Sequence, residues 1–258
     1  MNQTPANVKL FALEMRGVSV TSLKDVKLIV AEGVNWTVNA GEFWVVAAPQ
    51  HSGKTDFLMM AGGLSSPAGG EYLFLGESMP IFESPRLTHR LKLGFVFDGG
   101  QLLGSLTVAE NIALPLRYHG RASADEIESQ VHRLLEITEL LPWADSLPAN
   151  VGRSWRQRAG LARALALQPE VLLLDSPLTG LDVRHTMWWL GFLDQLSRGH
   201  RSLGNRPITL VVTVDDLRPW RIHAGRVACL SDRRLIVVGD WSAVEDSKER
   251  VIQELLSK

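Results

Sequence analysis

A glycine–lysine–threonine run at residues 53–55 has the clearest chemical content of the sequence. It follows an apolar stretch at 43–47 and nearly matches the phosphate-binding pattern G-x-x-x-x-G-K-[ST], with Ala48 at the first glycine position. In such a loop, backbone N–H groups surround phosphates at a helix N-terminus, the lysine reaches the β- and γ-phosphates and the threonine holds Mg²⁺. The alternative is a chance tripeptide at a helix start. We predict nucleotide binding by Ala48, Ser52, Gly53, Lys54, Thr55 and Asp56.

A candidate metal ligand stands at the end of another apolar run. Residues 172–174 are all leucine and lead directly into Asp175. A parallel strand brings such a carboxylate to the carboxyl edge of the sheet, which is where ligands bind in open α/β folds. Carboxylate and hydroxyl oxygens suit Mg²⁺. The sequence therefore predicts a Mg²⁺ site at Thr55 and Asp175, and a capping role for Asp175 after a buried strand is the alternative.

Elements that could position these residues alternate along the chain between short apolar runs and helical patterns. This alternation predicts an α/β fold with a largely parallel sheet. Continuous apolar runs at 171–174 and 208–214 are typical of strands buried on both faces. A capping box at 123–126 predicts a helix start. We expect several short strands in 7–46, including 26–30 and 43–47, further strands at 72–75 and 93–97, and a hairpin of 227–230 with 235–238. We expect helices at 55–61, 156–167 and 183–196, and a last helix capped by 242–245.

The composition excludes several classes of protein. The 258 residues carry 27 Lys+Arg and 28 Asp+Glu, and this net charge of −1 argues against binding to nucleic acid through net charge. Cys229 is the only cysteine, which excludes an internal disulfide and a cysteine-based zinc site and fits a reducing cytosolic compartment. Apolar runs fall well short of the roughly 18 residues of a membrane span, and no signal peptide is visible. We expect any link to a membrane to run through a partner.

A long stretch around the second apolar run carries a family resemblance. Residues 156–165 read RQRAGLARAL and lead into QPEVLLLDSPLTGLD at 168–182. This order resembles the nucleotide-binding domain of ABC transporters, as do 95–97 and 106–111, and the match covers roughly 8–240. The resemblance implies one domain over 1–258: a P-loop NTPase with a RecA-like core of roughly 1–97 and 169–258, an antiparallel β subdomain near the N-terminus, and an inserted α-helical subdomain of roughly 98–168.

Three catalytic positions of that family hold other residues here. A glutamine that contacts Mg²⁺ and senses the membrane subunit is replaced by Asp98. The glutamate that polarises the attacking water is replaced by Ser176, whose hydroxyl is a poor base at neutral pH. The histidine that contacts the γ-phosphate is replaced by Val214. The resemblance therefore implies that no catalytic residue of this set is intact.

The signature motif and the adenine site also depart from the family. The family's Leu-Ser-Gly-Gly-Gln, which binds the γ-phosphate of ATP held by a second subunit, aligns with Val151, Gly152, Arg153, Ser154 and Trp155. Arg153 could contact a phosphate, or it could be a solvated arginine. Asp56 would repel a phosphate if its side chain pointed inward. No aromatic residue suits an adenine stack, and Phe11 fits core packing better.

These departures favour a pseudo-ATPase: a subunit that holds the geometry of a transporter complex but hydrolyses little ATP. The alternatives are an active ATPase subunit, with a sequence somewhat like Mla or Mce lipid-transport ATPases, and a soluble P-loop regulatory protein. The resemblance implies a membrane permease and a second ABC ATPase subunit as partners, no nucleic acid, and a peripheral place on the cytoplasmic face of the inner membrane. ATP and Mg²⁺ are the implied cofactors, and we expect their binding to be weak or absent. The transported substrate and its direction stay open.

Overall fold

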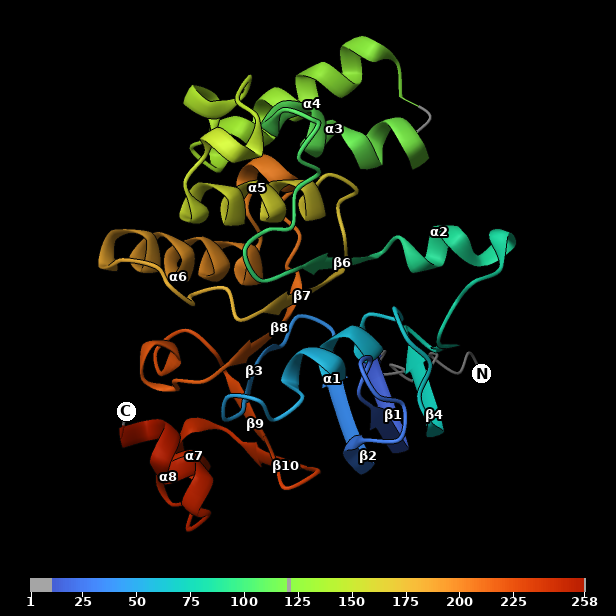
Figure 1. Ribbon diagram of the computed structural model, residues 1–258, viewed down its shortest axis with the longest axis vertical. Helices are drawn as coiled ribbons and strands as arrows, with labels where there is room; N and C mark the ends of the chain where they lie inside the picture. The colour runs from blue at the N-terminus through green and yellow to red at the C-terminus, as the bar shows by residue number, and fades with distance from the viewer. Residues whose placement is uncertain (1–10, 120–121, 258) are drawn as a thin grey trace, which may run out of the picture.

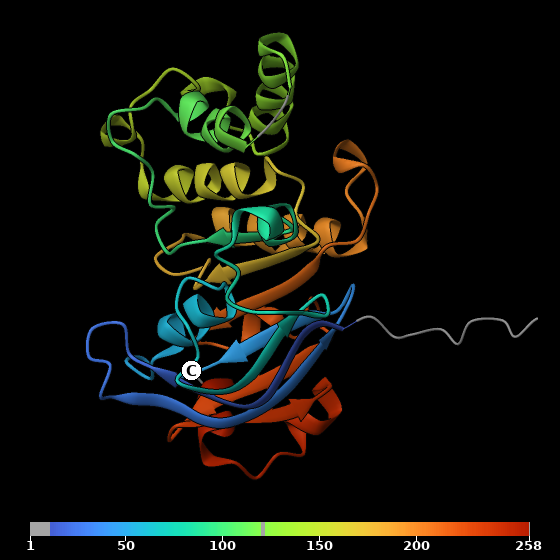
Figure 2. The ribbon, with the colours of Figure 1, turned by 90° about the vertical axis from the view of Figure 1, so that its right-hand side faces the viewer.

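The computed structural model describes residues 11–119 and 122–257, and within them the strands form two sheets. Figure 1 shows a six-stranded sheet running through the middle of the molecule, with a helical layer at one end and a four-stranded sheet beside helix α1 (Lys54–Ala61). Figure 2 shows that the smaller sheet lies across the lower half, away from the helical layer. This is the predicted α/β arrangement. No helix of the described ranges is long and apolar enough to cross a membrane.

The larger sheet has the strand order β10-β9-β3-β8-β7-β6 and is parallel except at β10. The predicted buried strands and hairpin are confirmed, with ends that differ by at most one residue. Because the five parallel strands end at one edge, the loops after β3, β6, β7 and β8 meet there. The strands are β3 (Phe43–Ala47), β6 (Leu93–Val96), β7 (Val171–Asp175), β8 (Thr209–Val214), β9 (Arg226–Ser231) and β10 (Arg234–Gly239).

The smaller sheet is antiparallel, in the order β2-β1-β4-β5, and confirms the predicted β subdomain. The prediction of a strand at 26–30 is wrong in its first half. The Asp25 side chain accepts a hydrogen bond from the Lys27 backbone N–H at 3.0 Å. The chain turns at this point and leaves Val26 exposed. Two long strands also replace the several short ones expected. The strands are β1 (Phe11–Thr21), β2 (Ile29–Asn39), β4 (Gly69–Phe74) and β5 (Glu77–Ser78).

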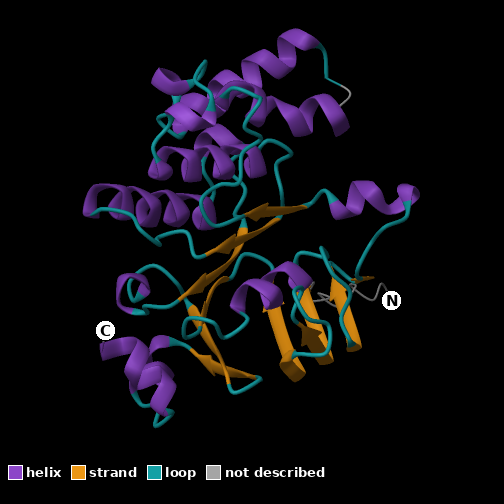
Figure 3. Ribbon diagram, in the orientation of Figure 1, coloured by secondary structure: helices purple, strands orange, loops and turns teal. Residues whose placement is uncertain are grey.

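A group of α-helices lies between β6 and β7 in the chain, and an inserted helical subdomain was predicted there (Figure 3). Ser123 caps α4 through the predicted capping box. At the last helices the prediction is wrong, because Asp240, not Ser242, caps α7 by accepting the Ala243 N–H. Further helices are α2 (Leu87–Arg90), α3 (Val108–His119), α4 (Ala124–Ile137), α5 (Arg153–Leu165), α6 (Val183–Arg198), α7 (Trp241–Glu245) and α8 (Arg250–Ser257), with short 3₁₀ turns at Ser84–Arg86, Leu141–Trp143, Pro148–Asn150, Arg201–Leu203 and Arg218–Trp220.

The large sheet separates two hydrophobic cores. On β3, Val45 and the residues two positions before and after it pack with the helical layer, α6 and the C-terminal helices. Trp44 and Val46 face the opposite way and pack with α1 and the antiparallel sheet. Strand β7 divides its residues in the same manner, with Leu172 on one side and Leu173 on the other. Burial on both faces explains the continuous apolar runs, because neither face of these strands meets water.

A buried arginine joins α5 to α6. The guanidinium carbon of Arg158 lies 3.7 Å from the ring centre of Trp188 and 4.6 Å from that of Trp155, so the cation contacts both indole rings. Its Nη1 also pairs with Glu139 at 2.7 Å, and its Nη2 lies 3.1 Å from His185 Nδ1. Because Arg158 only donates, this ring nitrogen of His185 accepts and the imidazole is neutral.

This contact predicts a loss of stability in acid. Burial, and next the nearby charge of Arg158, lower the pKa of His185 below its usual value. The unfolded chain then binds a proton below about pH 6.5 that the folded chain resists, so stability falls as pH drops through that range. Asp182 and Glu139 oppose the shift, whereas Arg184 adds to it.

Urea unfolding at pH 7.5 and at pH 5.5 measures this effect. We expect His185→Gln to lose less stability between the two pH values than the unmodified chain does. His132→Gln, at an exposed position on α4, is the matched control and should keep the full loss. An equal loss in both variants would show that His185 does not sense the acid. Burial lowers the pKa of His200 as well, so part of the dependence should persist.

Candidate functional site

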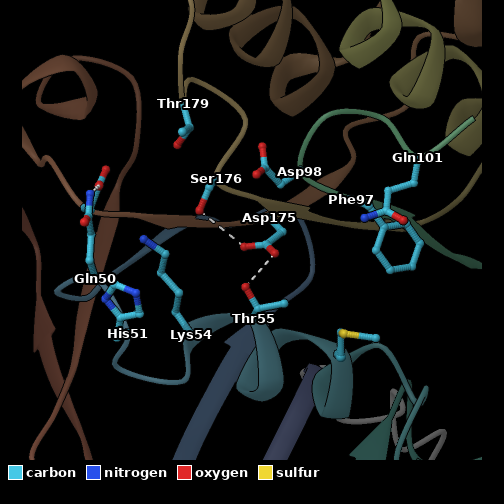
Figure 4. A pocket seen from close by; sticks show the side chains of 12 residues that line it. Gln50, His51, Lys54, Thr55, Phe97, Asp98, Gln101, Asp175, Ser176 and Thr179 are labelled. Atoms are coloured by element: carbon cyan, nitrogen blue, oxygen red, sulfur yellow. Dashed lines mark hydrogen bonds between the residues drawn. The ribbon is translucent and has the colours of Figure 1, made fainter. Parts of the chain in front are cut away.

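A cavity of about 570 Å³ opens at the carboxyl edge of the parallel strands. Figure 4 shows side chains around it from the loops after β3, β6 and β7, and Asp215 from the loop after β8 lines it as well. The loops come together there because parallel strands place all their carboxyl ends on one side. The cavity is lined by Gln50, His51, Lys54, Thr55, Met59, Phe97, Asp98, Gln101, Asp175, Ser176, Thr179 and Asp215.

The loop before α1 has the backbone that a phosphate loop needs. Gly53 has φ of +83°, and a Cβ there would lie 2.5 Å from Cβ of Val30, so only glycine fits without strain. The Ala48 N–H donates to the Val214 carbonyl at 2.9 Å, which ties the start of the loop to the end of β8. The loop hydroxyl of Ser52 is buried and has no hydrogen-bond partner among the described residues.

The two predicted metal ligands meet in the structure. Thr55 Oγ1 donates to Asp175 Oδ2 at 2.8 Å, although α1 and β7 are far apart in the chain. The other carboxylate oxygen, Oδ1, accepts from Thr213 at 2.8 Å and from Ser176 at 3.3 Å. Figure 4 shows Lys54 beside Thr55 on the same loop, with its side chain extending on the side of Gln50. A lysine, a hydroxyl and a carboxylate therefore share one wall of the cavity.

Ser176 and Val214, which stand at two of the three catalytic positions described above, lie close by but offer little chemistry. Ser176 is buried in a left-handed backbone conformation, with φ of +48°, and its hydroxyl is engaged by Asp175. Val214 is buried and does not line the main cavity. It lines a neighbouring cavity of about 300 Å³ that shares Ser176 and Asp215 with the first. Neither side chain can act as a general base at neutral pH.

Asp98 and Arg153 form an ion pair that spacing along the chain does not reveal. Arg153 Nη2 lies 2.6 Å from Asp98 Oδ1, and both side chains are about half-exposed. The arginine begins α5, whereas the aspartate follows β6, so the pair connects the helical layer to the sheet. Of the two uses suggested for Arg153, a phosphate contact and free solvation, the structure shows neither: its guanidinium is bound to Asp98.

The rest of the signature-like segment packs within its own chain. Val151 is buried, Gly152 precedes α5 and stays exposed, and Ser154 is half-buried on the first turn. Trp155 packs against Trp143, with ring centres 6.1 Å apart, and against His185. Among the described residues that line the cavity, none comes from 151–155. The structure therefore places this predicted phosphate-binding segment apart from Lys54 within one chain.

Asp56 lies beside the loop but faces away from the cavity. Its Oδ1 accepts the Leu23 N–H at 2.8 Å, which fastens the turn that follows β1. Asp56 is also not one of the cavity-lining residues. The condition for the repulsion suggested above, a carboxylate pointing inward, is therefore not met. The structure gives Asp56 the role of holding a neighbouring turn in place.

Gln101 and Asp215 line the cavity, and the motif comparison missed both. Gln101 lies three positions after Asp98, and a glutamine so close to that aspartate is the sequence feature that could have indicated a cavity residue here. Its carbonyl and that of Gly100 accept from Arg163 on α5, at 3.0 and 2.9 Å, which holds the loop over the sheet edge. Asp215 accepts a long hydrogen bond, 3.4 Å, from Gln50 of the phosphate loop.

Comparison with known proteins identifies the family. The family model for ABC transporters matches residues 31–179, which include the phosphate loop, Asp98 and Asp175. The chain belongs to the ABC transporter family. This ABC subunit is 30% identical to the intermembrane phospholipid transport system ATP-binding protein MlaF of Escherichia coli (strain K12), over 99% of this chain and 91% of MlaF. It is 33% identical to the methionine import ATP-binding protein MetN of Xylella fastidiosa, over 80% of this chain and 60% of MetN.

Solved structures agree with this assignment. A dimeric, post-hydrolysis state of the ATP-binding cassette MJ0796, bound to ADP and Pi, superposes with a TM-score of 0.76 and 28% identity, covering 86% of this chain and 96% of that one. The cbiO1 protein of Clostridium perfringens superposes with a TM-score of 0.77, covering 95% of this chain and 94% of that one. At 21% sequence identity, this likeness is evidence for a shared fold only. The predicted P-loop NTPase fold of an ABC nucleotide-binding subunit is thereby confirmed.

The residues of this ABC subunit fit a magnesium–phosphate group. The orphaned Ser52 hydroxyl, the start of α1 at Gly53 without a side-chain cap and the Thr55–Asp175 pair are the features that such a group would complete. Thr55 and Asp175 would hold Mg²⁺, which would supply neutralisation of phosphate charge, and Lys54 would add a second cation. Elsewhere in the described ranges, no group of three or more His, Cys, Asp or Glu side chains could hold a metal ion.

Proposed function

We propose that this chain is a hydrolysis-deficient member of its family: an ATP-binding-cassette subunit that keeps the architecture of a transporter ATPase and serves a structural or regulatory role. The observation that carries the proposal is the state of Ser176. Its hydroxyl, at the position of the family's catalytic glutamate, donates to Asp175 and cannot accept a proton from water. Loss of a general base alone lowers a rate by about 10²–10⁴-fold.

The proposed partners are a membrane permease and a second cassette subunit. MlaF and MetN are named as ATP-binding proteins of transport systems, and the cassette MJ0796 forms a dimer. These names support a peripheral place on the cytoplasmic face of the inner membrane for this chain too. Because the described helices are too short or too polar to span a bilayer, such an attachment would depend on the partner. Similarity to MlaF over 99% of this chain favours a lipid-transport complex.

The first test is ATP turnover by the purified chain. We expect no phosphate release above background, because Ser176 cannot act as a general base and Val214 cannot donate a hydrogen bond to the γ-phosphate. Lys54→Ala is the control, since a true activity of this site would need that lysine. A turnover near 1 s⁻¹, within the ordinary range of enzymes, that Lys54→Ala abolished would contradict the proposal. The same assay on membranes that carry the intact complex extends the test to the assembled state.

The second candidate is an active ATPase that uses other carboxylates. Asp98 and Asp215 line the cavity and could in principle accept a proton. Against this, the Asp98 carboxylate is already engaged in an ion pair with Arg153, at 2.6 Å. The soluble P-loop regulator is the third candidate, and recovery of the chain from cells without any membrane protein would favour it.

A further inference from the structure

A second cavity, of about 430 Å³, lies at the amino edge of the parallel strands, opposite the edge that carries Lys54. The turns that lead into β3, β7 and β8 surround it, together with the end of α5. Its volume is within the range of small-molecule sites. It shares no lining residue with the cavity around Lys54, so the proposed function gives it no role.

The walls of this second cavity are aliphatic. Leu165 and Ile208 are buried, Leu75 and Leu203 are partly buried, and the described lining residues include no aromatic side chain. A flat aromatic ligand would therefore find no ring to stack on. A flexible hydrocarbon chain, by contrast, loses contact with water wherever it touches leucine or isoleucine. The shape and chemistry of the walls favour an aliphatic group.

Leu75 lines this cavity in a strained backbone conformation. Its φ is +48°, in the left-handed region that residues with a Cβ rarely adopt. With Gly76 it forms the two-residue turn between β4 and β5, where asparagine, aspartate or glycine is the usual first residue. Strained residues of this kind gather at ligand-binding sites. The leucine at this position gives the cavity an aliphatic wall that the ordinary turn residues would not give it.

A cation without an ion-pair partner stands among these apolar groups. Of the two charged lining residues, Glu170 is paired with Lys92 at 3.0 Å, whereas Arg206 has no ion-pair partner among the described residues and is exposed. The segment 198–206 contains three arginines and a histidine and no acidic residue. Figure 2 shows this segment, in orange, projecting from the side of the molecule. Its positive potential attracts anions to this side of the cavity.

We propose that this cavity binds an aliphatic carboxylate, a fatty-acid anion of medium chain length, with its head at Arg206 and its tail among the four aliphatic side chains. A guanidinium matches a carboxylate through two parallel hydrogen bonds. A phosphate monoester, which carries up to about two negative charges at neutral pH, would need a second cation. The inference goes beyond the proposed function and does not depend on it, because the two cavities share no residue.

Calorimetric titration of the full chain with octanoate, below the concentration at which it forms micelles, tests this site. We expect saturable binding of one octanoate per chain. Octan-1-ol lacks the charge and butanoate lacks most of the tail, so each should bind at least about tenfold more weakly. Octyl phosphate should also bind more weakly than octanoate, because a single guanidinium faces its greater charge.

Two variants separate recognition of the head from recognition of the tail. Arg206→Met removes the charge and keeps an apolar stem, so it should weaken octanoate binding about tenfold and leave octan-1-ol binding unchanged. Leu75→Asn should weaken the binding of both compounds, because it places an amide in the apolar wall. Asparagine suits the left-handed turn, so this variant should fold, which circular dichroism checks. Arg201→Met is the matched control: it removes the same charge at an exposed position of the same segment, outside the lining, and should leave the affinity unchanged.

Several outcomes would overturn the inference. Octanoate that does not bind at millimolar concentration would do so, as would an unchanged affinity in folded Arg206→Met and Leu75→Asn variants. Equal affinity for octan-1-ol would show that the cation does not recognise the ligand, and tighter binding of octyl phosphate would refute the assignment to a carboxylate. None of these results concerns ATP turnover, so the proposed function would stand in every case.

Discussion

Ser176→Glu alone is expected to leave ATP turnover at background, even in a reconstituted complex. A glutamate at this position supplies a base, but Val214 still cannot donate a hydrogen bond to the γ-phosphate. The signature-like segment also still has Gly152 at the position of the family's serine. Residues that act as one catalytic unit are strongly non-additive, so restoring one of them recovers little. In a dimer with a competent subunit, one site would face the altered signature and the other would face Ser176 and Val214. A homodimer would carry every fault in each site.

Combined repair is expected to raise turnover by orders of magnitude. It requires Ser176→Glu, Val214→His and a signature rebuilt by Gly152→Ser, Arg153→Gly, Ser154→Gly and Trp155→Gln. The Arg153 change also removes the partner of Asp98, so Asp98→Gln belongs to the same set. Phosphate release by each variant is the measurement, and Lys54→Ala in the repaired background should abolish it. A rate typical of ABC ATPases with Ser176→Glu alone would show that the other positions are tolerated and that the chain is a slightly modified motor.

Gly100→Ala is expected to lower the free energy of unfolding by about 3 kcal/mol, the largest effect on stability among these predictions. Gly100 has φ of +80°, and a Cβ there would lie 2.1 Å from the backbone oxygen of Arg156 on α5. The left-handed conformation costs an alanine about 1–2 kcal/mol, and overpacking against backbone adds about 1–3 kcal/mol. Gly160, one turn further along α5, also lies against Gly100, because a Cβ at Gly160 would stand 2.6 Å from the Gly100 Cα.

Urea unfolding of Gly100→Ala against Gly104→Ala measures this effect. Gly104 lies in the same loop, has no positive φ, and a Cβ there would meet nothing within 4 Å, so its variant should keep its stability within about 0.5 kcal/mol. Equal stability of the two variants would show that the loop moves away from α5 at little cost. Such freedom would also weaken the case for a fixed Asp98, because that residue stands on the same loop.

Local patterns in the sequence were enough to determine most elements of this fold. The continuous apolar runs of β7 and β8, the helix predicted at 55–61 and observed as α1, and the capping box at Ser123 all follow from the order of neighbouring residues. Each depends on a side-chain period or on a hydrogen bond within one turn, which a short stretch of chain decides by itself. The order of the motifs also indicated the family, which the match of the ABC transporter model at 31–179 confirms.

Only the tertiary structure decided which charged side chains meet. Asp98 and Arg153 each looked like an isolated departure from the family, yet 55 positions apart they form one ion pair. Asp56 stands beside the phosphate loop in sequence but binds the turn at Leu23, 33 positions away. Long side chains choose partners by the path of the whole backbone, here by how the loop after β6 crosses α5 at Gly100. No periodicity within a segment encodes that crossing, and for this reason the electrostatics of the cavity became visible only in the folded chain.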